Sequence, residues 1–401
     1  MIPRTLLERI FSAASMERWN DHPHPHLFTE LGKQAHKMAA AWMLGKCEED
    51  AGRHVDWNAL IRGGVFEFLH RAVVTDIRPP VFHKLMNDGE TKSRLDEWVA
   101  KRLAPELDGF IPGLSNDFRE YCRSSDNAIE RKILRAAHYM ATGWEFSFIY
   151  HWSAGMYGVE FTRREVEANM AALDLPSARD ILDNEGSPLR GFFSLVGQLT
   201  FQKRWAQTPR VPQTSVLGHL MFVAVTSWLL SIEAGACPRR EYNNFFGGLF
   251  HDLPEVLTRD IISPVKASVE GLDDMIRRYE HEAMDKRVLP LIPQKWHDEL
   301  RWYTEEEFTN KTRTRNEIAI DPTERHDCDI PAELNRDEYD PIDGRLIEIC
   351  DKLAAYIEAA VSIRMGIHPP ELENAKRQLY KRFSLAESCG MSLGYLFEYF
   401  R

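Results

Sequence analysis

The stretch "GGLFHDLPEVLTRDIISPVK", Gly247–Lys266, places His251 and Asp252 side by side in an otherwise apolar, helix-like context. An imidazole and a carboxylate are both ligands for a divalent cation, and the ligands of such an ion converge from separate elements of a fold. His219 lies inside an apolar helical pattern upstream, and Asp351 begins the polar face of a third helical pattern. Taken alone, each fits an ordinary core histidine or a solvated helix residue. Together they form a candidate ligand set.

Hydrophobic periodicity predicts that the chain is helical almost throughout. Apolar residues recur at helical spacing in residues 215–234, 272–292 and 345–365, whereas alternating strand-like runs are nearly absent. The polar interval 310–341 separates two such patterns and is predicted to be a surface insertion. The expected fold class is therefore all-α.

The length of the chain favours more than one domain. A chain of 401 residues exceeds the usual size of a single domain. The segment "ALDLPSARDILDNEGSPLRG", Ala172–Gly191, collects Pro, Gly, Ser and Asp and is the best candidate linker. We predict a first domain at residues 1–171, a linker at 172–190 and a second domain at 191–401.

The two halves of the chain can be aligned with one another. At an offset of 186 residues, the identical pairs are Arg18-Trp19 with Arg204-Trp205, Leu31-Gly32 with Leu217-Gly218, and Trp42 with Trp228. At an offset of 184, residues 63–81 and 247–265 share eight identities in 19 positions. Matched Gly, Trp, Asp and Pro positions are more than shared amphipathicity generates, so they indicate a duplication.

The first copy lacks the candidate ligands. The aligned pairs are His219 with Lys33, His251 with Glu67, and Asp252 with Phe68. An ammonium group and a phenyl ring do not ligate a divalent cation. We therefore expect residues 1–171 to form a degenerate copy of the second domain, kept for packing or for regulation.

Composition restricts the partners and the location of the protein. The net charge is -11, whereas proteins that bind nucleic acid or anionic lipid usually present a strongly basic face. No run approaches the 18 apolar residues that a membrane span needs, and the N-terminus lacks the features of a signal peptide. The six cysteines form no CxxC pair, which is typical of reduced thiols. These features predict a cytoplasmic protein with no nucleic-acid polymer and no membrane as partner.

The second half resembles the HD-domain metal-dependent phosphohydrolases, and within them the bacterial 5'-deoxyribonucleotidases. The resemblance covers about Gly191 to Leu385. Its motifs are "RW" at residues 204–205, "GHL" at 218–220, "HDLPEVLTRDIISPVK" from residue 251 and "CDKLAAYIEA" from residue 350. One departure is Gly218, where the family usually has a glutamate, so a supporting role of that glutamate is missing here.

The resemblance implies a role for each motif residue. His219, His251, Asp252 and Asp351 would bind one divalent metal ion, which could be Co, Mn, Ni, Zn or Fe. Arg204, whose forked donors suit bidentate contact with a phosphate, would bind substrate, and Trp205 would pack on the sugar. The catalytic acids would be Glu255 and Asp260. Glu255 follows Asp252 by three residues, so a continuing helix would turn both to one face.

We expect the chain to be a metal-dependent 5'-nucleotidase that acts on (deoxy)nucleoside 5'-monophosphates. The resemblance also implies that the first copy takes the place of a second subunit, so that the chain is a pseudo-dimer, as a monomer or as a dimer of that unit. Two alternatives stay open. One is a nucleoside triphosphate hydrolase or a cyclic-nucleotide or alarmone phosphodiesterase, which extra cations at the site would indicate. The other is a nucleotide-sensing regulator without catalysis.

Overall fold

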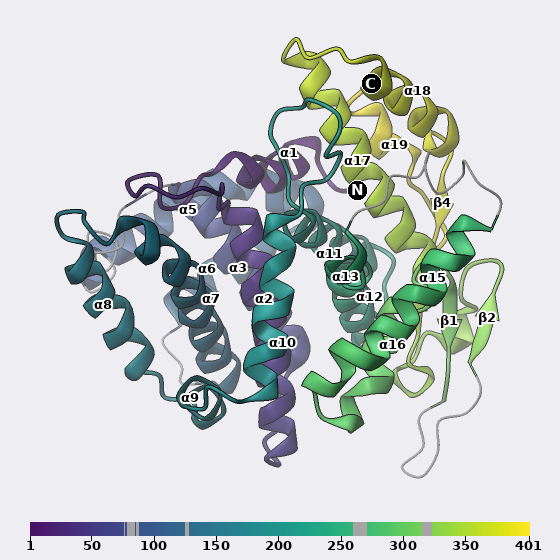
Figure 1. The fold of residues 1–401 in the computed structure, drawn as a ribbon. Helices are drawn as coiled ribbons and strands as arrows, with labels where there is room; N and C mark the ends of the chain where they lie inside the picture. The colour runs from purple at the N-terminus through teal and green to yellow at the C-terminus, as the bar shows by residue number, and fades with distance from the viewer. Residues whose placement is uncertain (76, 78–84, 86–87, 125–127, 260–270, 315–322) are drawn as a thin grey trace. The chain divides into compact units, whose positions relative to one another are not determined.

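The computed structural model describes residues 1–75, 77, 85, 88–124, 128–259, 271–314 and 323–401, and these are mostly helical (Figure 1). The chain forms two compact units, Met1–Asp180 and Ile181–Arg401. The boundary falls inside the predicted linker, but that segment is not irregular throughout. Residues Pro176–Asp183 form helix α9, and α10 begins at Pro188.

The first unit is built around α2, which packs against α7 and α3. Its helices are α1 (Arg4–Ser12), α2 (Glu30–Asp50), α3 (Trp57–Val74), α5 (Gly89–Phe110), α6 (Leu114–Arg123), α7 (Ile129–Ser153) and α8 (Val159–Ala171). The side chain of Thr29 caps α2 by accepting from the Gly32 amide, and Asp56 caps α3 by accepting from the Ala59 amide. These side chains satisfy amide donors that would otherwise have no partner at a helix start.

The second unit is built around α11, which packs against α12 and α17. Its helices are α10 (Pro188–Gly197), α11 (Val216–Glu233), α12 (Pro238–Phe250), α13 (Glu255–Thr258), α15 (Leu272–Ala283), α16 (His297–Thr304), α17 (Gly344–Arg364), α18 (Pro370–Phe383) and α19 (Gly394–Glu398). Gly248 lets α12 approach α11 closely, because a Cβ atom there would lie 2.9 Å from the Cα of Ala224. This close contact brings the C-terminal end of α12 against α11.

Helix α11 is the central core helix of this unit. By length and composition it is apolar enough to cross a membrane, with a mean hydropathy of 1.6 over 18 residues, so the expectation that no stretch has these properties was wrong. Inside the unit, 89% of that window is buried. A core helix of a soluble domain passes the same test, so the helix is weak evidence for a membrane span.

The all-α expectation holds for most of the chain, but short strands are present in the second unit. β1 (Asn310–Thr312) lies between β2 (Glu324–His326) and β3 (Ile342–Asp343) in an antiparallel sheet, and β4 (Glu387–Ser388) pairs with β5 (Met391–Ser392). β1 starts the interval predicted to be a surface insertion, yet its residues are buried. The side-chain oxygen of Asn310 accepts from the amide of Arg345, which ties β1 to the start of α17.

Candidate metal centre

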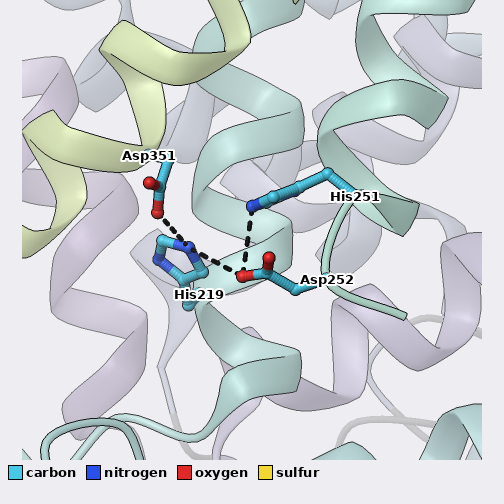
Figure 2. Close-up of side chains that lie close together, drawn as sticks. All are labelled: His219, His251, Asp252 and Asp351. Atoms are coloured by element: carbon cyan, nitrogen blue, oxygen red, sulfur yellow. Dashed lines mark ion pairs between the residues drawn. The ribbon is translucent and has the colours of Figure 1, made fainter. Parts of the chain in front are cut away.

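Four side chains from three parts of the second unit converge on one point (Figure 2). His219 comes from α11, Asp351 from α17, and His251 and Asp252 from the turn that follows α12. Each offers one ligand atom, and these atoms all lie within 4.8 Å of one another. His219, His251 and Asp351 are buried, whereas the side chain of Asp252 is 21% exposed. Asp252 is therefore the member of the group whose side chain is most exposed to solvent.

Direct contacts between imidazoles and carboxylates define the centre. The Nε2 atom of His219 lies 2.9 Å from Asp351 Oδ1 and 3.9 Å from Asp252 Oδ2. The Nε2 atom of His251 lies 3.2 Å from the same Asp252 oxygen. Each of these distances is between an imidazole nitrogen and a carboxylate oxygen, and both kinds of atom can ligate a cation.

The backbone fixes the tautomer of His251. Its Nδ1 atom lies 2.9 Å from the carbonyl oxygen of Gly248. A carbonyl only accepts, so Nδ1 carries a proton and Nε2 is the nitrogen that faces the centre, where it would offer its lone pair to a metal ion once the ring is neutral. A histidine ligand is held in this way when its second nitrogen donates to a carbonyl.

The charges at the centre shift the pKa values of its members. Burial, as the largest effect, lowers the pKa of His219, and the Arg204 guanidinium lowers it further. Burial opposes the charge of Asp252, but the imidazole of His251 outweighs it, and the pKa of Asp252 falls to about 2. The pKa of Asp351 is also well below its usual range, because Lys352 and His219 outweigh the effect of burial. Both carboxylates are therefore ionised at neutral pH.

The residues present fit a divalent cation. The Nε2 atoms of His219 and His251 are buried and face the carboxylate oxygens of Asp351 and Asp252 without forming a hydrogen bond of good geometry. Buried polar atoms are rarely left without a partner unless an ion or a water molecule satisfies them. Two imidazole nitrogens and two carboxylates form a mixed ligand set that suits manganese, iron, cobalt, nickel or zinc.

Arg204 lies beside the metal ligands. Its terminal nitrogens are 4.0 Å from Asp252 Oδ2 and 3.8 Å from Asp351 Oδ1, and its Nε atom is 3.5 Å from Glu358 Oε2. Trp205 adopts a positive φ of 53° and donates from Nε1 to Glu358 over 2.7 Å. A non-glycine residue rarely adopts this backbone conformation, so Trp205 lies in a turn of unusual backbone geometry.

Two residues of the centre were missed from the sequence. Glu358 holds both members of the Arg204-Trp205 pair, and the Nζ atom of Lys352 lies 2.6 Å from Asp351 Oδ2. The signal for Glu358 was its spacing, because a residue seven positions after Asp351 lies on the same face of a helix. Lys352 gave no such signal, because a lysine on a helix is usually a surface residue.

Of the two predicted catalytic acids, the structure describes Glu255 but not Asp260. The expectation that a continuing helix carries Glu255 was wrong, because α12 ends at Phe250 and α13 begins at Glu255 after a turn. The turn still holds Glu255 near the doublet, since its amide donates to the carbonyl of Asp252 over 3.0 Å. Asp260 lies outside the described residues. The catalytic roles of both acids stay predictions.

Comparison with known proteins assigns a domain to this region. Residues 196–380 match the family described as the HD domain. A 5'-deoxynucleotidase from Photobacterium profundum is 21% identical over 196 residues, which cover 47% of this chain and 82% of that protein. No solved structure gives a significant match. The second unit thus contains an HD domain with a distant 5'-deoxynucleotidase homologue, and its four convergent ligands are typical of that domain.

Proposed function

We propose that the second unit is a metal-dependent phosphomonoesterase that removes phosphate from deoxynucleoside 5'-monophosphates. The observation that carries the proposal is the group of four ligand atoms within 4.8 Å of one another, with an arginine next to it. The homologue named 5'-deoxynucleotidase supports the substrate class.

The position of each residue at the centre suggests its role in the proposed reaction. His219, His251, Asp252 and Asp351 would hold a divalent ion, which would supply polarisation of a phosphoryl oxygen and a water of lowered pKa. Arg204 would bind the nonbridging oxygens of the phosphate, while its Nε atom faces Glu358 at 3.5 Å. Glu255 would orient the attacking water or give a proton to the leaving sugar oxygen. Trp205, fixed by Glu358, would pack against the sugar.

Release of inorganic phosphate from a nucleotide panel tests the proposal. The panel contains deoxynucleoside and ribonucleoside monophosphates, triphosphates, a cyclic nucleotide and an alarmone, each with chelated protein and with each metal added back. Chromatography follows the nucleotide products as well, because cleavage of a phosphodiester does not release inorganic phosphate. We expect phosphate release from deoxynucleoside monophosphates that is lost on chelation and restored by metal. No release from any monophosphate with any metal would overturn the proposal.

One observation keeps a second candidate function open. Lys352 adds a cation beside Asp351, and extra cations at the site would favour a substrate with more phosphate groups. A nucleoside triphosphate hydrolase or an alarmone phosphodiesterase is therefore the alternative enzyme. If no nucleotide of the panel is turned over but calorimetry shows that one of them binds, the chain is a nucleotide-sensing regulator instead.

We also propose that the first unit is a degenerate copy of the second. Supporting this, the turns around Arg18-Trp19 and Arg204-Trp205 have the same local structure. The matching features are the backbone bridges Glu17 to Thr29 and Lys203 to Ser215, the positive φ of Trp19 (59°) and Trp205 (53°), and the helix caps Thr29 and Ser215. The bridges and caps keep the offset of 186 residues found in the sequence.

The glutamate that holds the arginine-tryptophan pair also has a counterpart. The Nε1 atom of Trp19 and the Nε atom of Arg18 each donate to Glu145 over 2.9 Å, as Trp205 donates to Glu358. Packing of the two copies as a pseudo-dimer, a cytoplasmic location and the absence of nucleic-acid and membrane partners stay part of this proposal.

A further inference from the structure

Lys352 follows the candidate ligand Asp351 on α17 and contacts it directly. The Nζ atom of Lys352 lies 2.6 Å from Asp351 Oδ2. A lysine on a helix is usually exposed, and an exposed ion pair contributes little to stability. Here the side chain of Lys352 is 28% exposed and that of Asp351 only 7% exposed. The ion pair is therefore largely shielded from solvent.

The two carboxylate oxygens of Asp351 have different neighbours. Oδ1 lies 2.9 Å from the Nε2 atom of His219, so it faces the other candidate ligands (Figure 2). A terminal nitrogen of Arg204 lies 3.8 Å from the same oxygen. Oδ2 faces the ammonium of Lys352 instead. Oδ1 is therefore the oxygen that is placed to ligate an ion, and Oδ2 is held by the lysine.

An aromatic ring fixes Lys352 from a second part of the chain. The Nζ atom lies 5.4 Å from the centroid of the Phe308 ring, and a cation is attracted by the face of an aromatic ring. Phe308 belongs to the segment between α16 and β1, and its ring centroid lies 5.9 Å from that of His251. Lys352 thus lies between one candidate ligand and a ring that contacts another.

We propose that Lys352 is a positioning residue of the metal centre, which binds Oδ2 of Asp351 so that Asp351 ligates the ion through Oδ1 alone. Carboxylates that ligate a metal ion are themselves hydrogen-bonded, and these partners orient the ligand. The charge of Lys352 also offsets part of the repulsion between the carboxylates of Asp252 and Asp351. The inference rests on the metal centre of the proposed function but not on the identity of the substrate.

Binding of cobalt to the chelated full chain, without nucleotide, tests this role. Competition with a chromophoric chelator gives the dissociation constant, and the visible absorption spectrum of the bound cobalt reports the arrangement of its ligands. Lys352→Met keeps the length of the side chain but removes its charge. We expect it to weaken cobalt binding about 10- to 100-fold, as for the loss of a partner that orients a ligand. The spectrum should also change, because Oδ2 is released.

Two further variants separate the charge of Lys352 from a general effect on packing. Lys352→Arg keeps a cation with N–H donors and should recover most of the affinity and the wild-type spectrum. Lys376→Met on α18 is the matched control. The Nζ atom of Lys376 also lies near an aromatic ring, 5.9 Å from the centroid of Tyr356. This variant should bind cobalt as the wild type does.

Wild-type cobalt affinity in Lys352→Met would contradict the assignment, and a raised KM in that variant would then make Lys352 a substrate-binding residue. Equal weakening in Lys352→Met and Lys352→Arg would also contradict it, because the charge would not matter. If Lys352→Met fails to fold, Phe308→Leu takes its place. It should weaken cobalt binding about two- to fivefold through loss of the ring face, and wild-type affinity there would count against the role.

The outcome is distinct from that of the hydrolysis test. A wild-type chain that binds cobalt but turns over no monophosphate would overturn the proposed function alone. Turnover that depends on metal, with unchanged cobalt affinity in the folded variants of Lys352, would overturn this inference alone. A wild-type chain that binds no metal ion would overturn both.

Discussion

At the residue scale, Arg204 lies beside the proposed metal ligands. Its terminal nitrogens lie 3.8 to 4.0 Å from the ligand carboxylates, too far for ordinary hydrogen bonds. The guanidinium is therefore near the ligands without being one of them. This position suits a group that binds the phosphate oxygens around the metal ion.

We predict that Arg204→Ala lowers kcat/KM for deoxynucleoside monophosphates about 100- to 1000-fold, as for loss of a donor to the developing charge. Metal content should stay at the wild-type level, because all four ligands remain. Elemental analysis and phosphate release measure the two effects. Arg301→Ala, which removes a surface ion pair with Asp285, is the control and should retain activity. Wild-type kcat/KM in Arg204→Ala would remove this residue from the site.

Glu358 is predicted to act through its neighbours. Glu358→Gln keeps an oxygen that accepts from Trp205 but loses the charge that faces Arg204, so we expect kcat/KM to fall about 10- to 100-fold. Metal content should not change. A fall in metal content equal to the fall in activity would show instead that Glu358 supports α17 as a whole.

At the element scale, α17 carries Asp351, Lys352 and Glu358 and is positioned by its first residue. A Cβ atom at Gly344 would lie 2.3 Å from the backbone nitrogen of Thr309 and 2.4 Å from its oxygen. Backbone atoms do not move aside as a flexible side chain does. The backbone of Phe308 and Thr309 approaches the start of α17 so closely that position 344 requires glycine.

Gly344→Ala should destabilise the second unit by about 1–3 kcal/mol, the usual cost of overpacking. It should also lower metal affinity, because Asp351 moves with the helix. Thermal unfolding with and without added metal measures both effects. Gly89→Ala, where a Cβ atom meets nothing within 4 Å, is the control and should be neutral. An unchanged unfolding midpoint in Gly344→Ala would show that this contact relaxes without cost.

The elements also show what the sequence could and could not predict. His219, the His251-Asp252 doublet and Asp351 could be predicted because each is a residue type that ligates metal ions. Each also lies in or next to a long helical pattern and matches a motif of the HD-domain family that the second half resembles. The end of α12 at Phe250 was missed, since the apolar pattern continues past it. Strands of two or three residues, such as Asn310–Thr312, are too short to produce an alternating pattern.

At the scale of the whole molecule, the two units share one local structure and differ in their ionisable groups. Each has an arginine-tryptophan turn beside a glutamate, and among the described residues the group of four possible metal ligands lies in the second unit. The alignment of the two halves located both turns and placed Lys33, Glu67 and Phe68 opposite the candidate ligands. It did not place His138 opposite Asp351, because the spacing from Glu67 to His138 differs from the spacing from His251 to Asp351. The contacts of Arg18 and Trp19 to Glu145, seven residues after His138, identified that position.

The central claim is that the chain binds one divalent ion, and that His219, His251, Asp252 and Asp351 hold it. The most direct test is the metal content per chain of the purified protein after saturation with metal and removal of the excess. We predict one ion per chain in the wild type and in Lys33→Ala with Glu67→Ala, and none in Asp252→Ala, which loses a charged ligand. A stoichiometric ion retained in Asp252→Ala, or two ions in the wild type, would contradict the account.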